Sequence, residues 1–183
     1  MQNLPSIVAR GILSHQRAER IEHSSIAMQD IQDRRRGKQV PNRRPLHDYA
    51  NLYFDARNPM MSYLNSHGSR DHVVLRVASH VLDVAEVVIT DGNAAAESTR
   101  FLVSPGGLVL LDEERVYAQW WTDSSPFVYI EKKRARCAEV LVPDVVAPEL
   151  ITGCYVRSIV QLTPCQGLAP KLSLEVNARV FSV

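Results

Sequence analysis

The chain has 183 residues, of which 45% are hydrophobic and 22% are charged, and its 21 lysines and arginines nearly balance 20 aspartates and glutamates. This composition is typical of a globular domain, and a chain of this length buries about 70% of its unfolded surface without a disulfide or metal staple. The sequence shows neither an apolar run of about 18 residues nor a secretory signal, and its three cysteines lack metal-ligand spacing. We therefore expect one cytoplasmic domain over residues 1–183, with no membrane span and no metal.

The positive charge is concentrated in one segment. RRRGKQVPNRR, residues 34–44, holds six of the 21 basic residues and no acid, whereas acids gather elsewhere, as at 112–114. In a nearly neutral protein such a segment can bind a polyanion locally, and nucleic acid is the leading candidate. Alternatively, the arginines belong to a solvated loop and only keep the protein soluble.

The first forty residues predict two helices. Apolar side chains at helical spacing predict a short amphipathic helix over residues 3–13, with Gly11 as its C-terminal stop. A second helix is expected over 26–36, because Ser24 and Ser25 can cap its start and its arginines lie at the C-terminal end, where the helix dipole favours cations. Gly37 then breaks this helix.

The rest of the chain mixes strands with short helices. A turn or helix start is expected at Asn58 and Pro59, a short helix at 79–84, a longer helix over 108–121, and a loop or short helix over 124–137. Segments rich in β-branched and aromatic residues predict strands at 48–54, 72–78, 86–92, 138–142, 149–162 and 171–181.

This order of elements favours an α+β domain, because strands and helices do not alternate regularly as they do in a doubly wound sheet. The sequence contains no G-x-G-x-x-G after a strand and no G-x-x-x-x-G-K-[ST]. A Rossmann or P-loop nucleotide site is therefore disfavoured. The motifs of serine hydrolases and zinc proteases, G-x-S-x-G and H-E-x-x-H, are also absent from the sequence.

Glu139 is the first candidate functional residue. It is the lone carboxylate at the start of the apolar run VLVP and directly follows the basic stretch KKRAR. A partly desolvated acid beside cations is suited to bind a ribose hydroxyl and to stabilise developing positive charge. Alternatively, Glu139 is an ordinary residue of an edge strand that pairs with Arg134 or Arg136.

The second candidate is the segment LHDYANLYFDARNPMM, residues 46–61. It interleaves three aromatic residues with Arg57 and two methionines, and aromatic faces next to an arginine suit the stacking of an unpaired base. Alternatively, the segment is a core strand followed by a helix start, and we expect that structural role for Phe54 and Met61. Trp120 and Trp121 could form a stacking platform for bases, but at least one of them is expected to pack at the end of the 108–121 helix.

Together these segments resemble the DarT family of DNA ADP-ribosyltransferases, the toxins of DarT–DarG toxin–antitoxin systems. The resemblance covers nearly the whole chain, and its pieces occur in the family's order. They are NLPSIVARGIL, SIAMQDIQDRRR, LHDYANLYFDARNPMM, VVITDGNAAAESTRF, LLDEERVYAQWW, KKRARCAEVLVP and LEVNARVF.

The resemblance implies an ADP-ribosyltransferase fold, a mixed and mostly antiparallel α+β domain with an NAD cleft between split sheets. It implies transfer of ADP-ribose from NAD, as a substrate, to a base in single-stranded DNA. Matching positions imply catalytic roles for Glu139 and Arg35, an NAD-binding element at about 19–37, and NAD contacts by Ser6, Ser14 and Arg35. The implied acceptor-base patch comprises Tyr53, Arg57 and Met60, with a loop that extends from Asn93 towards Glu139.

These roles agree with the chemistry of the residues. Cleavage of the N-glycosidic bond of NAD builds oxocarbenium-like charge on the nicotinamide ribose, which an anionic Glu139 stabilises through the 2′-hydroxyl. Arg35 is too basic to accept a proton, so we expect it to stabilise the deprotonating base or the NAD phosphates. The DNA phosphates would be held by some of the basic residues Arg36, Lys38, Arg43, Arg44, Lys132 and Lys133.

The sequence departs from the family pattern at its start. The family begins with a histidine-bearing strand, I-Y-H-x-T-H, where this sequence has Met1 and Gln2, so we expect that strand to be missing. Residues 163–171 also look short for the family's last helix. Two functions therefore stay open. The first is an active transferase that modifies thymidine, with guanosine as the next choice, and acts as a toxin that blocks replication, with a DarG-type macrodomain antitoxin as its partner. The second is a weakened or silent remnant that binds single-stranded nucleic acid.

Overall fold

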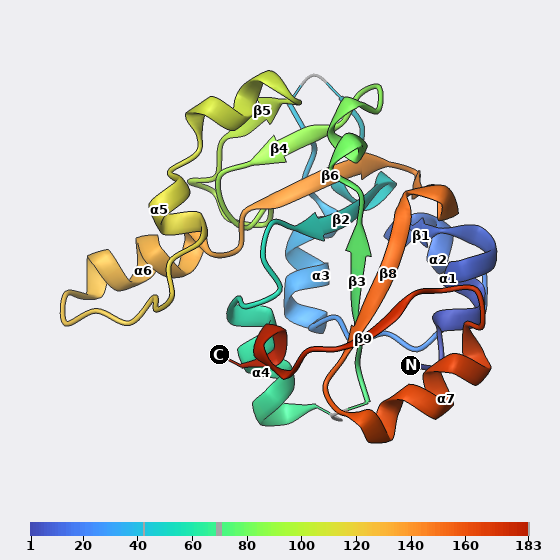
Figure 1. The fold of residues 1–183 in the computed structure, drawn as a ribbon. Helices are drawn as coiled ribbons and strands as arrows, with labels where there is room; N and C mark the ends of the chain where they lie inside the picture. The colour runs from blue at the N-terminus through green and yellow to red at the C-terminus, as the bar shows by residue number, and fades with distance from the viewer. Residues whose placement is uncertain (42, 69–70, 183) are drawn as a thin grey trace.

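The computed structural model describes residues 1–41, 43–68 and 71–182. Its strands form three sheets, with orders β1-β7, β2-β6-β4-β5 and β3-β8-β9, and every pair except β8-β9 is antiparallel (Figure 1). The strands are β1 (Ile12–Leu13), β2 (Tyr49–Tyr53), β3 (Val74–Val77), β4 (Val88–Thr90), β5 (Phe101–Val103), β6 (Glu139–Pro143), β7 (Val145–Val146), β8 (Ile151–Val156) and β9 (Leu174–Val176).

Short helices surround these sheets. In Figure 1, α5 and α6 project to one side, whereas α1, α2 and α7 lie on the opposite side, around β8 and β9. The α-helices are α1 (Leu4–Arg10), α2 (His15–Ala18), α3 (Gln29–Arg36), α4 (Pro59–His67), α5 (Glu113–Val116), α6 (Pro126–Ala135) and α7 (Leu162–Leu168). The 3₁₀ helices are η1 (Leu46–Asp48), η2 (Ser79–Asp83), η3 (Gly106–Leu110), η4 (Pro148–Leu150), η5 (Ile159–Gln161) and η6 (Ala178–Phe181).

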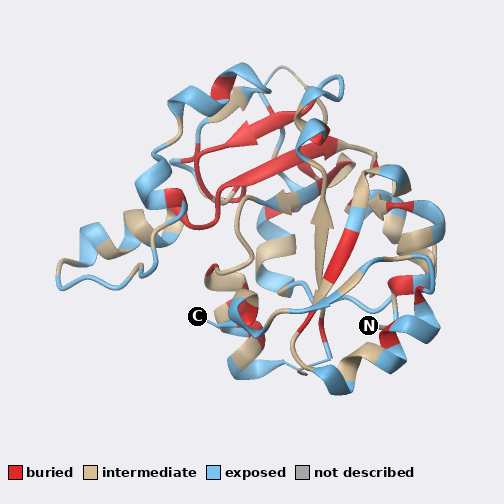
Figure 2. Ribbon diagram, in the orientation of Figure 1, coloured by how far each residue is buried: buried red, intermediate tan, exposed pale blue. Residues whose placement is uncertain are grey.

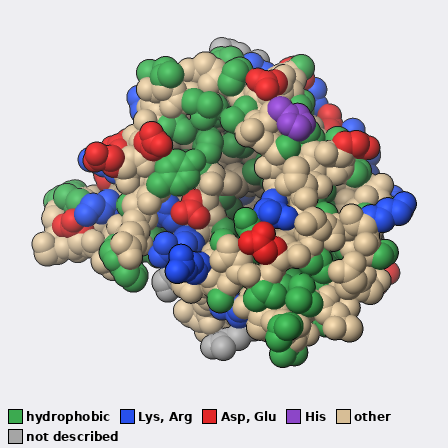
Figure 3. All heavy atoms as spheres, in the orientation of Figure 1, with side chains coloured by type: hydrophobic (Ala, Val, Ile, Leu, Met, Phe, Trp, Pro, Cys, Tyr) green, Lys and Arg blue, Asp and Glu red, His purple; other side chains and the backbone are tan. Residues whose placement is uncertain are grey.

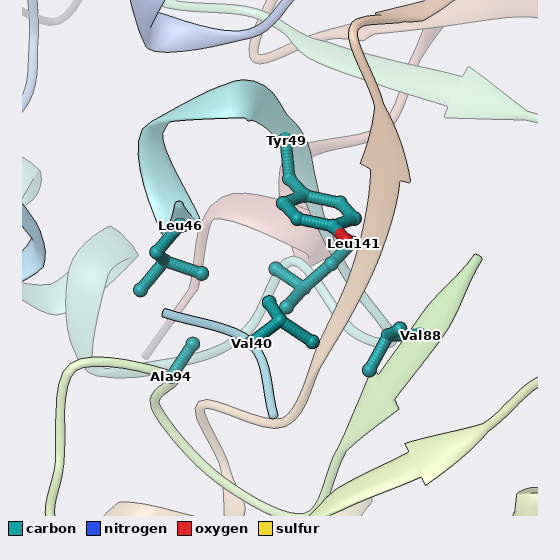
Figure 4. Packing of buried hydrophobic residues seen from close by; sticks show 6 residues of the cluster. All are labelled: Val40, Leu46, Tyr49, Val88, Ala94 and Leu141. Atoms are coloured by element: carbon teal, nitrogen blue, oxygen red, sulfur yellow. The ribbon is translucent and has the colours of Figure 1, made fainter. Parts of the chain in front are cut away.

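The four-stranded sheet carries the core on both faces because side chains alternate along its strands. On one face Tyr49 of β2 and Leu141 of β6 belong to one buried cluster (Figure 4). Its other members are Val40, Leu46, Val88 and Ala94. On the other face Ala50, Val140 and Val142 pack towards η2 and β7. Figure 2 shows the resulting band of buried residues along β4 and β6.

An open cleft of about 930 Å³ lies between two of the sheets. Its walls include β2, an edge strand of the four-stranded sheet, and β3, an edge strand of the three-stranded sheet. Most of the lining is apolar, with α4 contributing Met60, Met61 and Leu64. The predicted α+β architecture with split sheets is therefore confirmed.

Several predicted elements are confirmed and others are wrong. The strands predicted at 48–54, 72–78, 86–92 and 138–142 are present as β2, β3, β4 and β6, and Asn58 caps α4 by accepting a hydrogen bond from the Met61 N–H. The helix predicted over 26–36 starts later, because Met28 and not a serine is at its N-cap. Ser24 instead bonds to Asn3.

The helix predicted over 108–121 is wrong. The segment breaks into η3 and the single turn α5, because the Asp112 side chain accepts a hydrogen bond from the Arg115 N–H and starts a new helix there. Of the two tryptophans, at least one of which is expected to pack, Trp121 is half-buried and Trp120 is 60% exposed. The strands predicted at 149–162 and 171–181 are also shorter, because helical segments take over at Ile159 and at Ala178.

Gly11 ends α1 at a crowded position. Its φ of 85° lies in the left-handed region that favours glycine, and an added Cβ would lie 2.1 Å from the carbonyl oxygen of Val146. The predicted C-terminal stop at Gly11 is thus confirmed, and the next residue, Ile12, starts β1 and pairs with Val146. Gly11 therefore allows α1 and the β1-β7 pair to follow each other without a linker.

Replacing Gly11 with alanine should destabilise the fold. The new methyl group would meet a backbone atom of a paired strand, so we expect a loss of about 3 kcal/mol in the free energy of unfolding, measured by urea or thermal denaturation. Gly106→Ala is the matched control, because its Cβ would meet nothing within 4 Å. Equal stability of the two variants would contradict this account.

Candidate active site

Glu139 is the first residue of β6, the strand that lies between β2 and β4 in the four-stranded sheet. Its side chain is 0% exposed, so the carboxylate lies inside the protein and not on an edge strand. The alternative that Glu139 pairs with Arg134 or Arg136 is wrong, because those arginines pair with other carboxylates, Asp91 and Asp55 respectively. A buried acid needs other partners in order to stay ionised.

Arg35 is the main partner of this carboxylate. Its Nη1 and Nη2 donate to Oε1 and Oε2 of Glu139 at 3.2 and 3.1 Å, a two-pronged contact between residues 104 positions apart in the chain. Arg35 is only 4% exposed and lies in the last turn of α3, just before Gly37. The structure thus brings together the two residues for which the sequence predicted catalytic roles.

Two further donors complete the environment of the carboxylate. The Asn51 side-chain amide donates to Oε2 at 2.8 Å, and the backbone N–H of Ala94 donates to Oε1 at 2.9 Å. An ionised carboxylate has about four lone-pair sites, so these donors and the two of Arg35 occupy all of them. Thr90 also fixes the strand, because its hydroxyl accepts the backbone N–H of Glu139 at 3.0 Å.

The segment that carries Ala94 is anchored by Asp91. The Asp91 carboxylate accepts bonds from Arg100 Nε at 2.7 Å and from Arg134 Nη1 at 2.8 Å, although it is only 6% exposed. Burial tends to raise the pKa of Asp91, but its bonds to these two arginines outweigh that effect and lower it. The turn after β4 is therefore held in a fixed position beside Glu139.

Tyr53 and Asn51 connect this buried group to the cleft. Tyr53 is the cross-strand neighbour of Glu139, and both β2 residues are exposed and border the cleft at this edge of the sheet. Their side chains lie on the face of the sheet that carries Glu139, whereas Leu52 and Val140 lie on the opposite face, towards the cleft. The pKa of the Tyr53 hydroxyl is raised, first by burial of the hydroxyl and then by the negative charge of Glu139, so it is a neutral donor at physiological pH. Figure 3 shows a hollow on this side of the molecule, bordered by hydrophobic side chains.

The residues predicted to touch NAD are buried or half-buried. Ser14 is 1% exposed and caps α2, accepting a hydrogen bond from the Arg17 N–H at 3.4 Å. Ser6 is half-buried within α1. Within the described residues, Arg35 is the only predicted NAD-binding residue with a hydrogen bond to Glu139.

The residues predicted to contact DNA are spread over several elements. Met60 lines the cleft, whereas Arg57 Nε donates to the Ser182 carbonyl at 2.8 Å. The Asn93 side chain accepts the Ala95 N–H at 2.8 Å within the turn that also carries Ala94. These residues thus shape the surroundings of the cleft and of Glu139, and only Met60 and Tyr53 line the cleft itself.

Most of the basic residues are already paired. Lys38 Nζ donates to the Ala96 carbonyl at 2.6 Å, and Arg44 pairs with both Glu86 and Asp144. Arg36 is exposed and has only a loose i,i+3 pair with Asp33 at 3.4 Å. Segment 34–44 is therefore not a uniform cationic strip, since part of it holds the fold together.

Sequence reasoning did not select Asn51, Thr90 or Ala94. Asn51 gives a weak signal, because it is a polar residue that shares one face of β2 with Tyr49 and Tyr53. Thr90 and the Ala94 N–H give none, since their contacts depend on where the chain turns after β4. Residues 1–41, 43–68 and 71–182 contain no group of three His, Cys, Asp or Glu side chains placed to hold a metal ion, and no helix among them could cross a membrane.

Comparisons with known proteins agree with this geometry. The family profile described as "ssDNA thymidine ADP-ribosyltransferase, DarT" matches residues 1–180. A DNA ADP-ribosyl transferase–DNA ADP-ribosyl glycohydrolase fusion protein of Thermosipho africanus is 32% identical over 168 residues, covering 85% of this chain, which spans 40% of that relative's length.

Solved structures give the same result. Thermosipho africanus DarTG in complex with ADP-ribose superposes with a TM-score of 0.85 at 26% identity, over 98% of this chain and 48% of that one. Thermus sp. 2.9 DarT in complex with ADP-ribosylated ssDNA superposes with a TM-score of 0.84 at 25% identity, over 97% of this chain and 90% of that one. The chain therefore belongs to the DarT family of NAD-dependent DNA ADP-ribosyltransferases.

Proposed function

We propose that this protein transfers ADP-ribose from NAD to a base in single-stranded DNA, with Glu139 and Arg35 as catalytic residues. One observation carries the proposal: a fully buried glutamate is held by the two guanidinium nitrogens of Arg35, next to the exposed residues Asn51 and Tyr53 of the edge strand that borders an open cleft. Such a preorganised, desolvated carboxylate stabilises positive charge far better than one in water.

The reaction needs charge stabilisation at two points. As the N-glycosidic bond of NAD breaks, nicotinamide leaves with the bonding electrons, and positive charge develops on the ribose near the Glu139 carboxylate. The nitrogen of the base then bonds to the ribose C1 and releases its proton to water. Arg35 would stabilise the negative charge of the deprotonating base, since a guanidinium cannot itself take up the proton.

The surrounding residues suit the two substrates. Ser6 and Ser14 are the proposed NAD contacts besides Arg35, while Tyr53, Met60, Arg57 and the Asn93 turn would form the acceptor-base site. The half-exposed Tyr53 ring can stack on a base, and the exposed Arg36 guanidinium, with Lys38 nearby in the chain, would contact phosphates. Thymidine is the favoured acceptor, in line with the family description, and guanosine is the next choice.

A biological role and a partner follow from the relatives. We propose that the protein acts as a toxin that blocks replication by modifying the template, and that a macrodomain antitoxin of the DarG type opposes it. Support comes from the Thermosipho africanus relative, whose name joins a DNA ADP-ribosyl transferase to a DNA ADP-ribosyl glycohydrolase in one chain.

The activity can be tested with NAD and single-stranded oligonucleotides that each offer one kind of base. We expect a mass gain of one ADP-ribose on the thymidine oligonucleotide, and a loss of at least about 100-fold in rate for Glu139→Gln, because the amide carries no negative charge. Glu175→Gln is the matched control, since this exposed glutamate lies on β9 with only a 3.4 Å contact to Arg76.

The same assay separates the alternative function. DNA binding without modification by the unaltered protein would favour the silent nucleic-acid-binding protein over the transferase. Modification of guanosine in place of thymidine would correct the acceptor base and leave the reaction class intact. Full activity of Glu139→Gln would contradict the catalytic role of Glu139.

Arg35→Lys tests whether the planar fork matters. A lysine keeps the charge but cannot make two parallel bonds to the carboxylate, so we expect the rate to fall about 10-fold or more and stability to fall by about 1–2 kcal/mol. Arg10→Lys, at the exposed end of α1 and with no proposed role in binding, should change neither. A near-normal rate for Arg35→Lys would show that the reaction needs only the positive charge.

A further inference from the structure

We infer that Asn51 is a positioning residue whose side-chain amide occupies the place on Glu139 that a substrate hydroxyl takes during the reaction. The inference rests on the proposed function, because it concerns how the same carboxylate receives its substrate. It starts from the four donors that surround Glu139: two from Arg35, one from Asn51 and one from the Ala94 backbone.

A carboxylate with all its lone-pair sites occupied cannot accept another hydrogen bond without losing one. A ribose hydroxyl that approaches Glu139 must therefore displace one of the four donors. Their chemistry and surroundings differ, and these differences decide which donor is released.

Arg35 and Ala94 are poor candidates for release. Arg35 is 4% exposed, and withdrawing it would leave two opposite charges unpaired in the protein interior, which is strongly unfavourable. Ala94 is 0% exposed and donates from the backbone of a turn that is fixed by Asp91 and its two arginines. Moving that N–H would require the whole turn to move.

Asn51 differs from both. It is neutral, it lies on the edge strand β2, and it is exposed to solvent where that strand borders the cleft. Replacing its N–H on Oε2 by an O–H exchanges one neutral donor for another, so the carboxylate remains fully bonded throughout. The released amide can bond to water because Asn51 is exposed, and no buried polar group is left without a partner.

This arrangement gives Asn51 a defined effect on the reaction. Before substrate binds, the Asn51 amide holds Oε2 in the orientation that the ribose hydroxyl will need. When the hydroxyl binds, the amide releases Oε2. Asn51 therefore contributes to the orientation of the carboxylate, and it competes with NAD for Oε2 without adding to NAD affinity.

The inference is tested with Asn51→Ala and with carba-NAD as a non-reacting probe. We expect kcat to fall about 10-fold, because the carboxylate loses its orientation, while the Kd of carba-NAD stays within about twofold or becomes tighter. Asn65→Ala is the matched control: this asparagine also bonds through its amide, at 2.7 Å to the Phe181 carbonyl, and should lower stability without changing kcat. A Kd that rises 10-fold in Asn51→Ala would make Asn51 a direct NAD ligand and overturn the inference.

A second measurement does not depend on catalysis. The NMR signals of the Asn51 side-chain amide, identified by their loss in Asn51→Ala, should shift when carba-NAD is added to the unaltered protein. Signals that stay unchanged at saturating carba-NAD would refute the exchange. If the unaltered protein modifies no oligonucleotide yet the signals shift, the proposed function fails while the exchange on Glu139 stands.

Asn51→Asp provides an independent check. Aspartate has nearly the same shape as asparagine, but its carboxylate would lie about where the amide now donates. Its negative charge would therefore repel the Glu139 carboxylate. We expect its kcat to fall further than that of Asn51→Ala at pH 7.5, since it removes the donor and adds repulsion. A kcat equal to that of the unaltered protein would show that the donor on Oε2 has no role in orienting the carboxylate.

Discussion

The ion pair between Arg35 and Glu139 is the interaction on which the site depends. Each of these groups would cost several kcal/mol to bury alone, so neither residue is stable in the interior unless the other is present in good geometry. The two-pronged contact, together with Asn51 and the Ala94 N–H, leaves no lone-pair site of the carboxylate unfilled. The position of α3 relative to the sheet is thereby tied to the position of one side chain on β6.

The rest of the fold keeps these groups in register. β6 lies in the middle of its sheet, where hydrogen bonds to β2 and β4 hold it on both sides, and the Thr90 hydroxyl fixes its first N–H. Asp91 and its two arginines then hold the turn after β4 against α6. A few polar contacts, each between elements far apart in sequence, thus hold a buried ion pair in a fixed position within an ordinary α+β core.

The sequence predicts the elements of this site better than its contacts. Strands such as β2 and β6 are short, rich in β-branched or aromatic residues and bounded by turn residues, so they are recognised locally. The helix expected over 108–121 is absent, because Asp112 caps the separate helix α5. Exposed apolar residues such as Val109 also interrupt an apolar pattern that looks continuous in the sequence. Glu139 is recognisable as a lone carboxylate before an apolar run, and Arg35 by resemblance to a family. The role of Asn51 depends on cross-strand register, which cannot be read from one sequence.

The ion pair also constrains how the proposed reaction can use its two charges. A carboxylate neutralised by an adjacent guanidinium attracts a developing cation less strongly than a free one, so the pair must loosen as the ribose becomes positive. The deprotonating base becomes negative during the same reaction and competes for the guanidinium. A neutral hydroxyl cannot replace Arg35 on the carboxylate, but the two developing charges can. The carboxylate therefore turns towards the ribose only as the ribose becomes positive, while Arg35 turns towards the base, and neither buried group is left unpaired. A site that held Glu139 without Arg35 would therefore be harder to fold, because the carboxylate would be buried without a cation. Such a site could stabilise the positive ribose but not the negative charge of the deprotonating base.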